Sequence, residues 1–218
     1  MKKVLTLAVA AALAGGAAMS QAYEAGDWIL RAGAATVAPD ADSEVVPGLG
    51  VTVDVDDDTQ LSIIPVYMVT EDWGIELLAA TPFKHDIEVN EAPIDAGSTK
   101  HLPPTLTVQW YPRGGSTGWQ PYVGVGLNYT IFFDEKAASD LEGIVGKADL
   151  DLDDSFGLSA SAGVDIPFGE NWNFNAGIWY IDIDTTATVT LREADNAKVK
   201  FDVDIDPWVY NIGIAYKF

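Results

Sequence analysis

The feature that most constrains this chain is the alternation of side chains along its last eleven residues, Trp208–Phe218. Every second residue from Trp208 is apolar, with aromatic rings near both ends, and the residues between them are small or polar. Successive side chains of a strand point to opposite faces, and ten steps of about 3.4 Å tilted by about 40° rise roughly 26 Å. That height matches the apolar band of an outer membrane. Soluble edge strands seldom carry aromatics at both ends of an exposed face, so the pattern favours a strand that faces lipid on one side.

The N-terminus has the pattern of a secretory signal peptide. The basic pair Lys2–Lys3 precedes an apolar stretch at 4–18, and small residues follow at 20–22. We expect residues 1–22 to be a signal peptide and 23–218 to form one outer-membrane β-barrel. No other segment approaches the 18 apolar residues of a transmembrane helix.

Composition argues against several classes of partner. The chain has no cysteine, and all 33 acidic but only 10 of 12 basic residues follow position 22, which gives a formal charge of −23 there. Such a charge argues against nucleic acid. The acidic runs could hold divalent cations against lipopolysaccharide phosphates, but none has the glycine and terminal glutamate of a calcium loop. We favour a solvated acidic rim and expect neither metal nor cofactor.

Period-two alternation with turn signals recurs along the rest of the chain. It predicts an all-β fold, an eight-stranded antiparallel transmembrane β-barrel with strands at 26–38, 58–70, 73–85, 100–112, 119–133, 154–168, 171–191 and 197–218. Short connections would be periplasmic turns, whereas 39–57, 86–99 and 134–153 would be long extracellular loops. Residues 137–147 could form a helical turn within the third loop.

Parity along these strands assigns a lipid-facing surface that is almost free of charge. It holds Trp28, Leu30, Ala32, Leu61, Ile63, Tyr67, Trp73, Ile75, Leu77, Leu106, Val108, Trp110, Val123, Val125, Leu127, Tyr129, Phe156, Leu158, Val164, Ile166, Phe168, Trp172, Phe174, Ile178 and Tyr180. A charge facing the middle of the bilayer costs about 2–4 kcal/mol, so the absence of charges supports this parity.

The inward faces separate into an apolar upper part and a polar lower part. Beyond Tyr180 the outward residues turn acidic while the inward ones become apolar, which predicts strands that continue above the membrane around a hydrophobic well. We expect this well to be lined by Ile64, Val66, Met68, Leu78, Phe132, Trp179, Ile181, Ile183, Phe201, Val203 and Ile205. We expect a hydrogen-bonded plug below it, since unpaired charges in a narrow lumen are costly. The plug residues would be Arg31, Glu76, Gln109, Asn128, Asp165, Asn173, Asn175, Asn211 and Lys217. Packing of the apolar residues as a simple core remains an alternative.

Several long motifs resemble the outer-membrane protein W (OmpW) family. They are E-L-L-A-A-T-P-F-K-H at 76–85, H-L-P-P-T-L at 101–106, P-Y-V-G-V-G-L-N-Y-T at 121–130, W-Y-I-D-I-D-T-T-A at 179–187 and D-P-W-V at 206–209. The resemblance implies an eight-stranded barrel in the outer membrane of a Gram-negative bacterium. It also implies a narrow hydrophobic channel for small hydrophobic compounds, including alkanes in some relatives, with lateral exit through the wall. Leu78 and Trp179 match the family's constriction.

Prolines are consistent with a lateral opening, because proline cannot donate to a strand ladder. Pro65, Pro82, Pro103 and Pro104 are expected near the outer leaflet. Termination of pairing where strands enter loops explains Pro103–Pro104 equally well. The C-terminal Phe218 resembles the signal that outer-membrane barrels present to the barrel-assembly machinery.

The two histidines, His85 and His101, could face each other across the third and fourth strands. A metal would need a further ligand, for which Asp86 is the obvious candidate, and exposed rim histidines are the simpler interpretation. The set His85, Asp86 and Ser98 could imitate a catalytic group, but no catalytic order stands out. We therefore expect no enzyme activity.

Two hypotheses follow for the function. The first is passive uptake or binding of small hydrophobic molecules through an apolar well, a polar plug and a lateral exit, in a multi-pass barrel surrounded by outer-membrane lipid and lipopolysaccharide. The alternative is a structural or interaction barrel with a filled interior and no transport. The two differ in whether an open apolar cavity exists.

Overall fold

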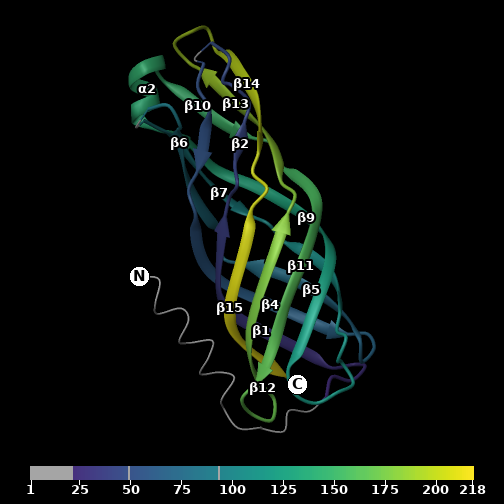
Figure 1. Ribbon diagram of the computed structural model, residues 1–218. Helices are drawn as coiled ribbons and strands as arrows, with labels where there is room; N and C mark the ends of the chain where they lie inside the picture. Colours follow the sequence, from purple (N-terminus) through teal and green to yellow (C-terminus); the bar gives the residue numbers. More distant parts are fainter. Residues whose placement is uncertain (1–21, 49, 93) are drawn as a thin grey trace.

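Eight antiparallel strands close into a barrel in the computed structural model (Figure 1), which confirms the predicted fold class. The structure describes residues 22–48, 50–92 and 94–218, so the predicted signal peptide lies outside it apart from Ala22. The barrel strands are β1 (Trp28–Ala38), β4 (Asp58–Met68), β5 (Trp73–Ala80), β8 (Thr105–Trp110), β9 (Gln120–Ala137), β11 (Ser155–Pro167), β12 (Trp172–Ile181) and β15 (Trp208–Lys217). The ring closes because β1 pairs with β15, and β11 pairs with both β9 and β12.

The strands are joined at one end of the barrel by the short turns that the sequence predicts. These turns are residues 69–72, 111–119 and 168–171, and the first and last barrel strands also begin and end there. We call this the turn end.

The other end continues as a strand-built extension instead of the predicted loops (Figure 1). One sheet consists of β3 (Val53–Val55), β6 (Phe83–Val89), β7 (Asp95–Leu102) and the upper part of β9. The other consists of β2 (Asp42–Ser43), β10 (Ala148–Leu152), β13 (Asp184–Leu191) and β14 (Ala197–Asp204). The prediction of a long second loop at 86–99 is wrong. Most of this segment belongs to β6 and β7, which pair as far as Glu88 and Asp95 and leave only residues 90–94 between them.

A short helix is present where the third loop was expected to contain a helical turn. The α2 helix, Ser139–Val145, lies within the predicted 137–147. Among the described residues, no helix combines the length and hydropathy needed to cross a bilayer.

Four of the predicted long strands are interrupted where the barrel meets the extension. The breaks fall at 81–82, 103–104, 182–183 and 205–207. Three of them contain proline, which removes a ladder donor, and Asp206 has a positive φ of 37°. Pro65 is an exception to the expected position near the outer leaflet. It pairs with Leu30, next to the Trp28–Tyr67 pair at the turn end.

The inversion of polarity along the last two strands is present in the structure. Inward Phe201, Val203 and Ile205 are buried on and beyond β14, and Val209 is buried on β15. Their outward neighbours are exposed, apart from the half-buried Asp206 and Tyr216, and they are acidic at Asp202 and Asp204 and apolar from Trp208 onward. The odd-numbered residues therefore point inward on both sides of the Pro207 break, while the outer surface changes from solvent-exposed to lipid-facing.

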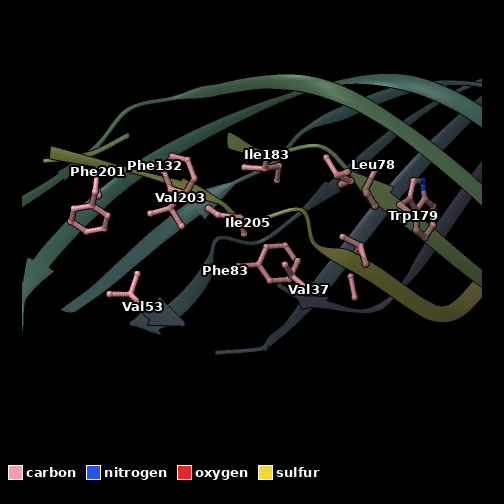
Figure 2. Close-up of a cluster of buried hydrophobic side chains, with 14 of the residues drawn as sticks. Val37, Val53, Leu78, Phe83, Phe132, Trp179, Ile183, Phe201, Val203 and Ile205 are labelled. Carbon is pink, nitrogen blue, oxygen red and sulfur yellow. The ribbon is translucent and has the colours of Figure 1, made fainter. Parts of the chain in front are cut away.

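Buried apolar side chains form two clusters. The larger fills much of the extension and the upper barrel and includes Leu78, Phe132 and Trp179 (Figure 2). The smaller lies lower in the barrel and contains Tyr23, Ile29, Val66, Met68, Tyr111, Tyr122 and Ala215.

A charge on the lipid-facing band should destabilise the folded barrel. Ile212 lies between the aromatic ends of β15 and is 70% exposed. We expect Ile212→Arg to lower the free energy of unfolding in lipid vesicles by about 2–4 kcal/mol. Asp151→Arg, on the exposed face of β10, is the control and should change it little. Equal losses for both variants would show that the Ile212 face does not meet lipid.

Candidate functional site

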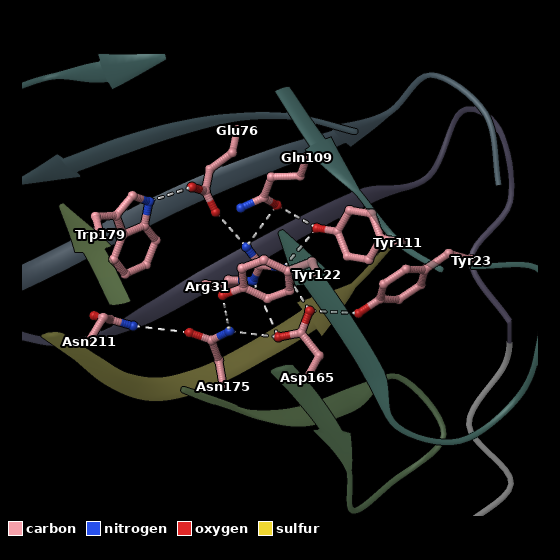
Figure 3. Close-up of polar contacts among 10 residues, drawn as sticks. All are labelled: Tyr23, Arg31, Glu76, Gln109, Tyr111, Tyr122, Asp165, Asn175, Trp179 and Asn211. Atoms are coloured by element: carbon pink, nitrogen blue, oxygen red, sulfur yellow. Dashed lines mark hydrogen bonds and ion pairs between the residues drawn. The ribbon is translucent and has the colours of Figure 1, made fainter. Parts of the chain in front are cut away.

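A buried polar network in the lower barrel is centred on Arg31 (Figure 3). Its guanidinium donates from Nη1 to Glu76 Oε2 at 2.5 Å and from Nη2 to Asp165 Oδ2 at 2.7 Å. Both ion pairs are fully buried and join strands β1, β5 and β11 across the lumen. The Arg31 guanidinium also lies 4.2 Å from the ring centre of Tyr122.

Neutral groups extend this network around the two carboxylates (Figure 3). Asp165 accepts hydrogen bonds from Tyr23 Oη at 2.9 Å and Asn175 Nδ2 at 2.8 Å. Asn211 Nδ2 donates to Asn175 Oδ1 at 3.1 Å. Because one arginine faces two acids, these donors supply the stabilisation that a second cation would otherwise give.

The predicted plug residues divide into members of this network and separate contacts. Arg31, Glu76, Gln109, Asp165, Asn175 and Asn211 are joined in it. Asn128 instead bonds to the hydroxyls of Thr105 and Thr130. Lys217 donates to Asp27 and to the Ala22 carbonyl at the turn end, and Asn173 Oδ1 has no partner among the described residues. These three are inward, as parity predicts, but at other levels of the lumen.

The sequence interpretation missed three tyrosines of the network, Tyr23, Tyr111 and Tyr122. Tyr111 accepts from Arg31 Nη2 at 2.9 Å and donates to Gln109 Oε1 at 2.6 Å. The signal was available for Tyr122, because Val123 is assigned outward and its neighbour must then point inward.

Trp179 separates the polar network from the apolar region above it. Its Nε1 donates to Glu76 Oε1 at 3.1 Å, and its side chain is completely buried in the larger apolar cluster. A Cβ on Gly177 would lie 2.5 Å from Cη2 of the indole, so glycine at that position makes room for the ring. Trp179 therefore forms a closed floor with one polar edge.

A cavity of about 300 Å³ lies above this floor, within the extension. Its walls come from β3, β6, β7, β9, β10, β13, β14 and the α2 helix, and most of the lining side chains are apolar. This volume is at the lower end of the range for small-molecule pockets, about 300–1,000 Å³.

The residues expected to line the well are placed at three levels. Phe132, Phe201, Val203 and Ile205 line the cavity. Ile64, Leu78, Trp179, Ile181 and Ile183 pack in the same apolar cluster, and Leu78 lines a separate space of about 10 Å³ beside Phe83 and Pro103. The prediction that Val66 and Met68 line the well is wrong. Strand β4 descends toward the turn end and places both residues in the lower cluster with the tyrosines.

Much of the cavity wall comes from segments that the sequence interpretation took for loops. Val51, Val53, Leu150 and Leu152 contribute to it. Each of these pairs alternates with acidic or polar residues, so the same period-two signal was present there on a shorter scale.

The two histidines lie side by side in the cavity wall and are not exposed on a rim. His85 and His101 are 1% and 2% exposed, and their ring centres are 4.7 Å apart. His85 Nδ1 lies 2.5 Å from the carbonyl oxygen of Asp56. Asp86, the suggested metal ligand, points away and pairs with Lys84 on the surface.

Both histidines remain neutral near pH 7. Charged outward residues on β6 and β7 place this region above the lipid-facing band. Burial lowers the pKa of His85, and burial together with the neighbouring His85 lowers the pKa of His101 to about 3.

Three acids meet near the junction of barrel and extension. Carboxylate oxygens of Asp182, Asp184 and Asp206 lie within 4.8 Å of one another. Asp206 already accepts hydrogen bonds from Tyr180 Oη and from the backbone N–H of Ile183. The cluster thus contributes to the local structure of the β12–β13 and β14–β15 breaks.

Comparisons with known proteins agree with this architecture. The model of the OmpW family matches residues 24–218. Outer membrane protein W of Vibrio cholerae is 44% identical, with 97% of each chain covered. The crystal structure of OprG from Pseudomonas aeruginosa superposes with a TM-score of 0.84 at 44% identity, covering 91% of this chain and 99% of that one. Outer membrane protein AlkL of Ectopseudomonas oleovorans is 25% identical over 92% of this chain and 86% of its own length.

These relatives place the chain in the cell. It is a multi-pass protein of the outer membrane of a Gram-negative bacterium, with short periplasmic turns and an extracellular extension, and it is not an enzyme.

Loss of the central cation should destabilise the barrel strongly. Arg31→Leu leaves Glu76 and Asp165 buried without a cation, and we expect it to lower the free energy of unfolding by about 3–5 kcal/mol. Arg113→Leu makes the same change in an exposed turn, where it should cost less than about 1 kcal/mol. Urea unfolding in lipid vesicles measures the free energy of unfolding of both variants. Similar losses would contradict the central role of Arg31 in the buried network.

The buried histidines should make the protein less stable in acid. The unfolded chain takes up protons as the pH falls through about 6.5, whereas folded His101 resists protonation down to about pH 3. Between pH 7 and 4.5 the wild type should therefore lose roughly 2–3 kcal/mol more stability than His101→Phe. Parallel stability curves for the two proteins would refute this.

Proposed function

Because the chain belongs to the OmpW family, we propose that it takes up small hydrophobic molecules passively from outside the cell. The observation that carries the proposal is the apolar cavity of about 300 Å³ above the membrane. A buried apolar surface of this extent binds apolar molecules by removing them from water. The open cavity also counts against a barrel with a completely filled interior.

The molecule would not continue straight down the barrel. Below the cavity, Trp179 is fully buried and hydrogen-bonded to Glu76, and the Arg31 network fills the lumen beneath it. An apolar molecule passing this level would have to break buried ion pairs and desolvate charged groups, which is costly. The well therefore binds without leading to the periplasm.

A seam in the wall offers a sideways route to lipid. The β5–β8 ladder ends at Leu78 and Thr105, and the β6–β7 ladder begins at Phe83 and His101. Between them, no ladder pair among the described residues joins 79–82 to 102–104. The small space beside Leu78, Phe83 and Pro103 lies at this seam. Lateral movement here would transfer a hydrophobic molecule into the outer leaflet.

Other contacts complete the proposal. The lipid-facing band would contact outer-membrane lipid and lipopolysaccharide, and the exposed Phe218 would be recognised by the barrel-assembly machinery. Export would remove residues 1–22.

Filling the cavity should reduce uptake strongly. Ala187 lies in the cavity wall on β13, and Ala187→Trp places an indole in the space that a ligand would occupy. We expect protein-dependent uptake of the apolar fluorescent probe N-phenyl-1-naphthylamine to fall roughly tenfold in cells that carry this variant, because its binding volume is lost.

Thr186→Trp is the matched control, since it adds the same ring to the opposite face of the same strand. It should leave uptake unchanged, provided that heat-modifiable gel mobility shows both barrels folded. Undiminished uptake in Ala187→Trp would contradict the proposal.

A further inference from the structure

Two side chains of the cavity wall, His85 and His101, each carry a buried polar atom that has no partner among the described residues. Nε2 of His85 and Nε2 of His101 are shielded from solvent and have no hydrogen-bond partner among the described residues. The two hydroxyls of the wall are occupied, because Thr185 donates to the Asp153 carbonyl and Thr99 to the Lys100 carbonyl. Buried polar atoms are nearly always hydrogen-bonded, so this pair requires an explanation.

Geometry defines what His85 can bind. Its Nδ1 lies 2.5 Å from the Asp56 carbonyl oxygen, which can only accept. The proton of the neutral ring is therefore on Nδ1, and Nε2 presents a lone pair. A partner for this atom must be a hydrogen-bond donor.

The second ring complements the first. The His101 ring lies 4.7 Å from that of His85 and is flanked by Phe83 and Phe132 at 5.6 and 5.8 Å. A hydroxyl group both donates and accepts, so it can donate to His85 Nε2 while its oxygen accepts from His101, whose neutral ring can carry its proton on Nε2. Phe132 also lines the cavity, and its apolar ring suits the hydrocarbon part of the same molecule.

We propose that the His85–His101 pair binds the hydroxyl group of a small hydrophobic alcohol or phenol held in the cavity. The pair would give the well a preference among hydrophobic molecules, favouring those with one hydroxyl over hydrocarbons and ethers. This inference rests on the proposed binding function of the cavity, and it names the substrate class within that function.

Two matched probes test the preference in the intact protein in lipid vesicles. 1-Naphthol carries a hydroxyl, whereas 1-methoxynaphthalene keeps the oxygen and the rings but cannot donate. After correction for partitioning into lipid, we expect 1-naphthol to bind roughly 3- to 10-fold more tightly, the usual effect of one net hydrogen bond. The double variant His85→Phe/His101→Phe keeps aromatic rings in the wall and should reduce this ratio to about one. Thr186→Val, on the outer face of β13 away from the cavity, is the control and should retain the preference.

A second measurement does not depend on the folding of any variant. The chain has only two histidines, so 15N-histidine labelling gives a simple spectrum of four ring nitrogens. 1-Naphthol should shift the unprotonated Nε2 signal of His85, and 1-methoxynaphthalene should leave it in place.

The outcomes separate this inference from the proposed function. Saturable binding of both probes with equal affinity would overturn the hydroxyl site and leave the hydrophobic well standing. A preference for 1-naphthol that survives in the double variant would also overturn it. Absence of saturable binding of either probe would overturn both proposals.

Discussion

The ion pairs of Arg31 with Glu76 and Asp165 are the interaction on which the rest of the molecule depends. An eight-stranded barrel has a lumen that side chains nearly fill, and charges placed there must be paired. These three side chains come from β1, β5 and β11, so their contact fixes the lumen across its width. The pairs close the membrane-spanning part, and any space for a ligand must then lie above them.

Trp179 forms the boundary between the polar network and the apolar interior above it. Its indole N–H is satisfied by Glu76, on the polar side, while the ring packs into the apolar cluster that continues to the cavity. A phenylalanine there would leave one Glu76 oxygen without this donor, and a polar residue would lose the apolar contact. One side chain thus serves two environments, which explains why the change from polar to apolar interior occurs within a single level of the barrel.

The sequence was sufficient to predict the barrel strands, their faces and six members of the polar network, because a period of two is a local property of the chain. The sequence was not sufficient to predict the level of each inward residue along the barrel axis. Val66 and Ile64 share one inward parity but enter different clusters, since height depends on strand tilt and register with neighbours. The His85–His101 contact likewise joins two strands through their register, and nothing local to either residue indicates burial.

Short segments of alternating apolar and polar residues form strands in the extension, as longer ones do in the barrel. At Val51–Val55 and Asp149–Asp153, polar and mostly acidic residues alternate with apolar ones over only a few positions, as charged and apolar residues do in β14. Outside the membrane, an apolar inner face with an acidic outer face is what a water-soluble two-sheet structure requires. The extension strands β6 and β13 can adopt this pattern only if other strands cover their edges, and β3 and β10 supply those partners. The acidic segments are therefore the outer surface of the cavity wall, and the well exists because they pair with β6 and β13.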